Sequence, residues 1–173
     1  VFSYSQKLFH AFVRYLDRFS GKRVLEIGAF EDQHMANYFR STGALYKGVS
    51  LNGEGIPNTI DGNFMDIEET ELYDLIISSG VFEEYAVDRW ESGGRHFDWK
   101  RYNNGERLTK LRSLLKPNGW NVMGTISSPC LFSTHQLESH GLAVRWKIDS
   151  FYGTDLGERH FSQSELVVTQ RVD

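Results

Sequence analysis

The sequence is poor in cysteine, histidine motifs and long apolar runs, and each absence narrows the possible classes of protein. The single cysteine, Cys130, has no second thiol with which to form an internal disulfide or a metal or redox pair. The six histidines are scattered and match neither HxH nor HExxH spacing, so no metal site is predicted. No apolar run reaches the ~18 residues that a membrane-spanning helix needs, which predicts no membrane partner.

A secretory signal is also missing from the start of the sequence. The first 19 residues lack both a basic start and an uninterrupted apolar stretch. Together with the lone thiol, this predicts a reducing, cytoplasmic location. The sequence begins with Val1 rather than methionine, so we expect it to be part of a larger polypeptide.

Positive charge is in short supply. The chain has 19 Lys and Arg against 23 Asp and Glu, a net charge of −4, whereas gripping a phosphate backbone needs a dense basic field. Nucleic acid is therefore disfavoured as a partner. The length of 173 residues fits a single domain, residues 1–173, and the 14% aromatic content could fill a core or line a pocket for a flat or cationic ligand.

The first half of the chain alternates helices with short buried strands. Apolar residues three and four positions apart over 4–19 predict an amphipathic helix, and the segment 1–21 is expected to cover the sheet. YDLIISS, Tyr73 to Ser79, has an apolar core without a charged face, as expected of a central parallel strand. The other elements expected here are strands at 23–27, 44–51 and 59–60 and a helix at 31–40.

The second half changes pattern towards its end. A helix over 106–115 is expected to stop at Pro117-Asn118-Gly119, before a strand over 120–127. A short helix over 134–140 then leads to two strands, 142–152 and 165–172, which suggest an antiparallel edge. The segment 86–105 is rich in aromatics and arginine without clear periodicity, and loops of this length tend to be functional lids or disordered.

The turn after the first strand is the expected ligand site, because open parallel sheets bind ligands beyond the carboxyl ends of their strands. Gly28 would let the backbone pass close to a ligand. Phe30, Glu31 and Asp32 follow, and the two carboxylates would oppose a pyrophosphate. A ligand with a positive centre and an amine, such as a sulfonium amino acid, would be less opposed.

Five segments occur in an order and spacing that resemble the successive motifs of class I S-adenosylmethionine-dependent methyltransferases. They are VLEIGAF, YKGVSLN, DGNFMDI, YDLIISSGVFEEY and LTKLRSLLKPNGWNVM. The resemblance covers about 22–127, and the final strand pair matches the family's reversed last strand. It implies a Rossmann-like α/β fold with a seven-stranded mixed sheet, order 3-2-1-4-5-7-6, helices on both faces, and S-adenosylmethionine as cofactor.

The resemblance also implies which positions contact that cofactor. Glu26 and Gly28 align with the acid and the first glycine of the loop near the methionine portion, whereas the later loop glycines are replaced. Ser50 stands where the family has the acid that holds the ribose hydroxyls, so Asn52 or Glu54 would have to replace it. The full set implied is Glu26, Gly28, Ala29, Phe30, Ser50, Asn52, Phe64, Asp66, Ser79 and Gly80.

Structural explanations compete with several of these assignments. Phe64 and Asp66 sit where the family places residues beside the adenine ring, and Ser79 and Gly80 follow the fourth strand beneath the cofactor. Phe64 and Phe30 also suit a place in the core, where phenylalanine is found more often than against a cofactor. Asp66 is also compatible with an N-cap for a helix over the following IEETEL.

The predicted reaction is methyl transfer to a small-molecule or sugar-like acceptor held under the 86–105 loop. An oxygen or nitrogen nucleophile would need a base, for which Glu83, Tyr85 and His96 are the candidates. The alternative is a degenerate domain with a binding or scaffolding role in a larger protein, suggested by Phe30, Asp32 and Ser50. A nicotinamide-dependent oxidoreductase is a weaker reading, since the GxGxxG fingerprint is missing.

Overall fold

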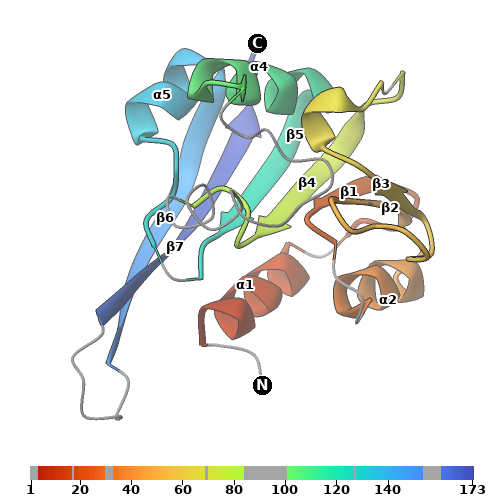
Figure 1. The fold of residues 1–173 in the computed structure, drawn as a ribbon, viewed down its shortest axis with the longest axis horizontal. Helices are drawn as coiled ribbons and strands as arrows, with labels where there is room; N and C mark the ends of the chain where they lie inside the picture. The colour runs from red at the N-terminus through yellow and green to blue at the C-terminus, as the bar shows by residue number, and fades with distance from the viewer. Residues whose placement is uncertain are drawn as a thin grey trace.

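A computed structural model describes residues 4–16, 18–29, 33–68, 70–83, 101–126, 128–153 and 161–173. The strands in these residues form one mixed sheet in the order β3-β2-β1-β4-β5-β7-β6, which confirms the predicted order (Figure 1). Neighbouring strands from β3 to β5 run parallel, and β7 is antiparallel to both β5 and β6. The strands are β1 (Arg23–Ile27), β2 (Leu45–Ser50), β3 (Thr59–Asp61), β4 (Tyr73–Ser79), β5 (Leu115–Gly124), β6 (Leu142–Gly153) and β7 (Phe161–Arg171).

Helices lie on both faces of this sheet. Figure 1 shows α1 and α2 on one side and α4 and α5 on the other. The helical elements are α1 (Tyr4–Tyr15), α2 (His34–Ser41), the 3-10 turn η1 (Phe64–Asp66), α4 (Asn104–Leu114) and α5 (Thr134–Ser139). In the part of the chain that the structure describes, none of the helices has the length and apolar character needed to cross a membrane.

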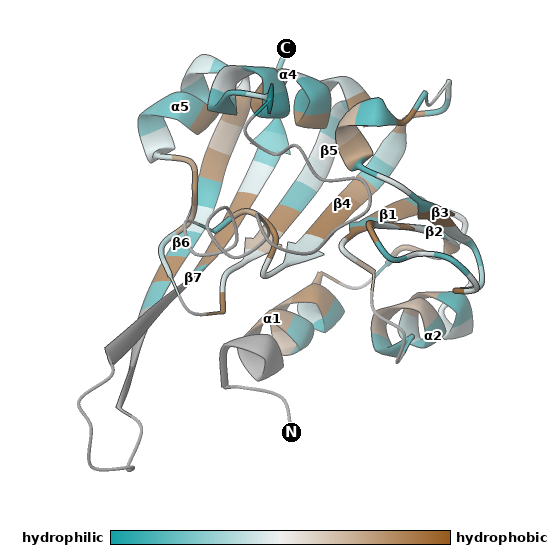
Figure 2. Ribbon diagram, viewed as in Figure 1, coloured by the Kyte–Doolittle hydropathy of each residue, from teal (hydrophilic) through white to brown (hydrophobic). Residues whose placement is uncertain are grey.

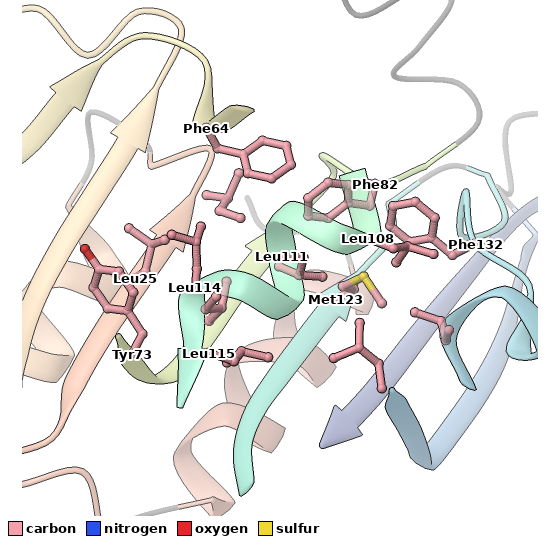
Figure 3. Close-up of a cluster of buried hydrophobic side chains, with 14 of the residues drawn as sticks. Leu25, Phe64, Tyr73, Phe82, Leu108, Leu111, Leu114, Leu115, Met123 and Phe132 are labelled. Atoms are coloured by element: carbon pink, nitrogen blue, oxygen red, sulfur yellow. The ribbon is translucent and has the colours of Figure 1, made fainter. Parts of the chain in front are cut away.

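Buried hydrophobic side chains form two layers, one on each face of the sheet, between the sheet and the helices. Leu75 and Ile77 of β4 belong to the layer that contains Phe39 of α2, whereas Ile76, between them, belongs to the layer that contains Leu111 of α4. Apolar residues concentrate along the central strands (Figure 2). Figure 3 shows the layer that contains Leu111 of α4. Because β4 is buried on both faces, its continuous apolar run is explained.

Helices α1 and α2 are shorter than the helices predicted at 4–19 and 31–40. Helix α1 ends at Tyr15 rather than near residue 19, and α2 runs from His34 to Ser41, with residues 30–32 outside the described part. Leu16 and Phe19 nevertheless pack against the same buried layer as α1. The apolar residues near the end of the predicted helix are therefore spaced for burial, although the helix α1 itself ends before them.

Strand β5 begins earlier than predicted. Leu115 already pairs with Tyr73, and Trp120 pairs with Leu75, so residues 116–119 form an irregular insertion inside the strand. This Lys-Pro-Asn-Gly segment contains a proline, which lacks a backbone donor, and a glycine, and such residues are typical of bulges. The turn predicted before the strand is thus built into it.

Candidate cofactor site

The turn after β1 brings together the carboxyl ends of three strands. Gly28 has a φ of 80°, and its N–H donates to the carbonyl of Val49 on β2 at 2.8 Å. Ala29 donates to the same carbonyl at 3.2 Å. A Cβ on Gly28 would lie 2.5 Å from Cγ2 of Val81, just after β4. The left-handed backbone and this close approach both require glycine at position 28.

Glu26, on β1 two residues before Gly28, is a buried acid. Its side chain is 6% exposed, and its Oε2 accepts a hydrogen bond of 2.5 Å from the hydroxyl of Tyr46 on β2. Tyr46 is 9% exposed. Burial and then the Glu26 carboxylate raise the pKa of Tyr46. The hydroxyl therefore stays protonated and acts as a donor throughout the neutral range.

The carboxyl ends of β2 and β3 place an acid beside Ser50. The register pairs Ser50 with Asp61, and the N–H of Gly53 donates to Oδ1 of Asp61 at 2.9 Å. The N–H of Asn52 donates to the hydroxyl of Ser50 at 3.4 Å. The sheet thus puts a carboxylate on β3 next to the position where β2 has only a hydroxyl. Asp61 was not among the residues predicted from the sequence.

Phe64 and Asp66 occupy opposite environments on η1. Phe64 is 2% exposed and packs edge to face on Phe82, with ring centroids 5.4 Å apart (Figure 3). Asp66 is exposed and accepts a hydrogen bond of 2.9 Å from the hydroxyl of Tyr102. The N-cap of η1 is Asn63, whose side chain accepts from the N–H of Met65. No helix follows Asp66 in the described residues up to 72, so Asp66 caps none there.

The carboxyl ends of β4 and β5 are joined by a second glycine. Gly80 has a φ of 68°, and its N–H donates to the carbonyl of Gly124 at 2.8 Å. Ser79, one residue before it, is 9% exposed. Glu83 is 5% exposed, and its Oε2 accepts a hydrogen bond of 2.6 Å from the N–H of Ile126. The predicted base therefore anchors the segment that follows β5.

A second buried acid, Glu165 on β7, holds the same segment. Its Oε2 accepts from the N–H of Cys130 at 2.7 Å, and its Oε1 lies 3.5 Å from Nζ of Lys147 on β6. Its own N–H donates to the hydroxyl of Thr125 at 2.7 Å. Glu83 and Glu165 together fix the chain between β5 and α5 at the carboxyl edge of the sheet. The sequence reasoning missed Glu165, because an isolated acid in a strand carries no local signal.

The thiol of Cys130 is expected to react slowly in the folded protein. Burial raises its pKa from the ordinary 9.0 to about 11. At pH 8 this lowers the thiolate fraction by about 100-fold, and the thiolate is the reactive form. We predict slow modification by a thiol reagent such as Ellman's reagent in buffer and fast modification in denaturant. Since the chain has one cysteine, the absorbance reports this site alone. Equal rates in both solvents would contradict the prediction.

Three of the predicted site residues lie outside the described part of the chain. They are Phe30, Tyr85 and His96. Most of the predicted 86–105 loop also lies outside it, and the described residues resume at Arg101, just before the partner of Asp66, Tyr102. The other predicted positions all lie at or near the carboxyl edge of β1 to β5.

The strand order defines a Rossmann-like domain, a class of fold that binds ligands at the carboxyl edge of the sheet, where the glycine turn and the buried acid lie. Residues 3–168 match the family described as a methyltransferase domain. The chain therefore belongs to this methyltransferase family. No curated protein sequence matches it.

Solved structures support the same fold. An S-adenosylmethionine-dependent methyltransferase from Methanosarcina mazei is similar with a TM-score of 0.65 at 10% identity, over 93% of this chain and 97% of that one. The N-methyltransferase NodS from Bradyrhizobium japonicum gives 0.59 at 12% identity, over 97% and 96%. The 1,6-didemethyltoxoflavin-N1-methyltransferase from Burkholderia thailandensis, solved with bound 1,6-didemethyltoxoflavin and S-adenosylhomocysteine, gives 0.62 at 12% identity, over 98% and 77%. At these identities the likeness concerns the fold.

Proposed function

We propose that this protein transfers a methyl group from S-adenosylmethionine to a small-molecule or sugar-like acceptor. The observation that carries the proposal is the glycine turn of a methyltransferase-family sheet, where Gly28 lies beside Val81 and follows the buried Glu26. A carboxylate at this position favours a ligand with ammonium or sulfonium charge over a pyrophosphate. The net charge of −4 supports an acceptor other than nucleic acid.

The residues around the turn suit the amino-acid portion of the cofactor. Glu26, Gly28 and Ala29 would hold this portion, and Ser79 and Gly80 at the end of β4 would lie beneath it. Gly28 and Gly80 both have positive φ, which lets the chain turn sharply after β1 and after β4. Phe30 completes the proposed set on the turn.

The ends of β2 and β3 suit a ribose and an adenine. Ser50, Asn52 and Asp61 would hold the ribose, since a carboxylate can accept hydrogen bonds from both hydroxyls of a vicinal diol. Asp61 supports this assignment because its Oδ1 is already oriented by the N–H of Gly53. Phe64 and Asp66 are the proposed neighbours of the adenine. Phe64 packs against Phe82, and the two rings would together form an apolar side of the adenine site.

The bound cofactor would supply an activated methyl group on its sulfonium. The residues of the chain then need to align the acceptor and exclude water, an effect worth up to about 7–11 kcal/mol in well-oriented systems. Glu83, Tyr85 and His96 are the proposed groups for removing a proton from the acceptor. Glu83 is held by the N–H of Ile126, which fixes the orientation of its carboxylate.

Thermal unfolding with and without S-adenosylmethionine or S-adenosylhomocysteine tests the proposal. Ligand at 100 times its dissociation constant should stabilise the fold by about 2.7 kcal/mol. For a chain of this length we expect a saturable rise in Tm of roughly 5–10 °C. NAD at the same concentrations is the matched control, and it should leave Tm unchanged.

Absence of a shift up to millimolar ligand would contradict the proposed function. It would favour the alternative of a binding or scaffolding domain in a larger protein. A shift with NAD alone would favour an oxidoreductase instead.

A further inference from the structure

We infer that Tyr46 is a positioning residue for cofactor binding, whose hydroxyl holds the Glu26 carboxylate in the orientation that receives the charged amino-acid part of S-adenosylmethionine. The inference rests on the proposed function and adds a residue to the same site. The register of β1 and β2 pairs Val24 with Tyr46 and Glu26 with Gly48. The Tyr46 hydroxyl therefore reaches Glu26 diagonally, from the neighbouring strand.

The contact is buried beside an apolar layer of the core. Glu26 and Tyr46 are 6% and 9% exposed, and the layer around Tyr46 contains Val24, Met35 and Phe39. A polar group in such a layer is costly unless it is hydrogen-bonded, and a charged one more so. The distance of 2.5 Å between Oη and Oε2 is that of a charge-assisted hydrogen bond. The phenol thus supplies one hydrogen bond to the buried carboxylate.

Helix α2 fixes the phenol ring in place. Phe39 stacks on Tyr46 with ring centroids 6.4 Å apart and an interplanar angle of 16°. The guanidinium of Arg40 lies 5.5 Å from the ring centroid on the same tyrosine. Because the ring is held by two residues of α2, its hydroxyl points in a defined direction. A carboxylate bound by such a group is pre-organised for its ligand.

Gly48 leaves the space that this arrangement needs. A Cβ on Gly48 would lie 3.2 Å from the hydroxyl of Tyr46 and 2.8 Å from the Cβ of Ala29. Ala29 belongs to the turn proposed to hold the amino-acid part. The hydroxyl of Tyr46 and Ala29 of the turn therefore lie on either side of Gly48. We expect loss of the Tyr46–Glu26 hydrogen bond to alter the position of the turn.

Ligand pairs that differ only in the amino-acid part test the inference. S-adenosylhomocysteine and 5′-methylthioadenosine share the adenosine and the sulfur, but only the first has the amino-acid group. Tyr46→Phe keeps the ring and its stack on Phe39. We expect it to weaken binding of S-adenosylhomocysteine by about 10- to 150-fold, the size of a hydrogen bond to a charged group. Binding of 5′-methylthioadenosine should change by less than about 2-fold. Isothermal titration calorimetry measures both.

Tyr73→Phe is the matched control. Tyr73 is a tyrosine that is 1% exposed at the start of β4, the end of the strand opposite the site. Its change should leave the affinity for both ligands unaltered. Glu26→Gln should weaken S-adenosylhomocysteine selectively. Because Tyr46 acts through Glu26, the double variant should bind no more weakly than Glu26→Gln alone.

Several outcomes would overturn the inference. Equal weakening of both ligands by Tyr46→Phe would indicate a structural role, and so would the same loss in Tyr73→Phe. Unchanged affinities in Tyr46→Phe would overturn the inference while leaving the proposed function intact. Failure of the unaltered protein to bind S-adenosylhomocysteine would overturn both.

A spectroscopic measurement covers the case in which Tyr46→Phe does not fold. The hydroxyl proton of Tyr46 can be followed by NMR in unaltered protein carrying 13C-labelled tyrosine. We expect its resonance to shift on addition of S-adenosylhomocysteine and to stay in place with 5′-methylthioadenosine. The same response to both ligands, or to neither, would overturn the inference.

Discussion

Gly28→Ala is expected to lower the free energy of unfolding by about 2–5 kcal/mol and to weaken cofactor binding. The φ of 80° costs an L-residue about 1–2 kcal/mol. The new Cβ would lie 2.5 Å from Cγ2 of Val81, and such overpacking costs about 1–3 kcal/mol more. Urea denaturation measures the first effect, and the ligand-induced shift in Tm measures the second.

Gly55→Ala separates the two causes. Gly55 has a φ of 79°, but nothing lies within 4 Å of its Cβ position. This variant carries the backbone strain alone, so we expect it to lose about 1–2 kcal/mol. Val81→Ala in the Gly28→Ala background removes the atom that the new Cβ meets and should restore part of the stability. If Gly28→Ala and Gly55→Ala lower the free energy of unfolding by the same amount, the close approach to Val81 does not contribute to the destabilisation.

Glu165→Ala is expected to destabilise the fold by about 2–4 kcal/mol. The change leaves the N–H of Cys130 without the Glu165 carboxylate as its acceptor. An unsatisfied buried donor costs about 1–3 kcal/mol, and hydrogen bonds to charged groups lie at the upper end. The partly exposed Lys147 also loses the carboxylate that lies 3.5 Å away. Chemical denaturation with far-UV circular dichroism measures the loss.

Two further variants make the Glu165 test specific. Glu165→Gln retains an oxygen that can accept from the N–H of Cys130, so its loss should be smaller than that of the alanine variant. Glu138→Ala removes an exposed glutamate of α5 and should change stability by less than about 0.5 kcal/mol. If Glu165→Ala is as stable as Glu138→Ala, Glu165 does not anchor the segment after β5.

Part of the candidate site could be proposed from the sequence because its positions lie within single motifs. The family resemblance assigns Glu26 and Gly28 through the motif around the first turn, and Ser79 and Gly80 through the motif at the end of the fourth strand. The partner of Glu26 could not be found in this way. Tyr46 lies 20 residues further along the chain, and only the register of β1 and β2 brings the two together.

The missing acid of β2 illustrates the same limit. The sequence directs attention to Asn52 and Glu54, which are near Ser50 along the chain. The parallel pairing of β2 and β3 instead puts Asp61 beside Ser50. Paired strands in a parallel sheet bring together residues that are far apart in sequence. Such residues can lie closer to each other than to residues in the adjoining loop.

The sequence by itself determined the strand segments, the α/β class and, through its motif series, the order of the sheet, because burial of apolar side chains leaves a pattern that is local in the chain. Only the tertiary structure decided which polar side chains meet. Glu26 with Tyr46, Asp61 with Gly53 and Glu165 with Cys130 all depend on strand register and on the path of the chain at the carboxyl edge. The physical reason is that a hydrogen bond needs its two groups within about 3 Å, a condition that the spacing of residues along the chain does not set.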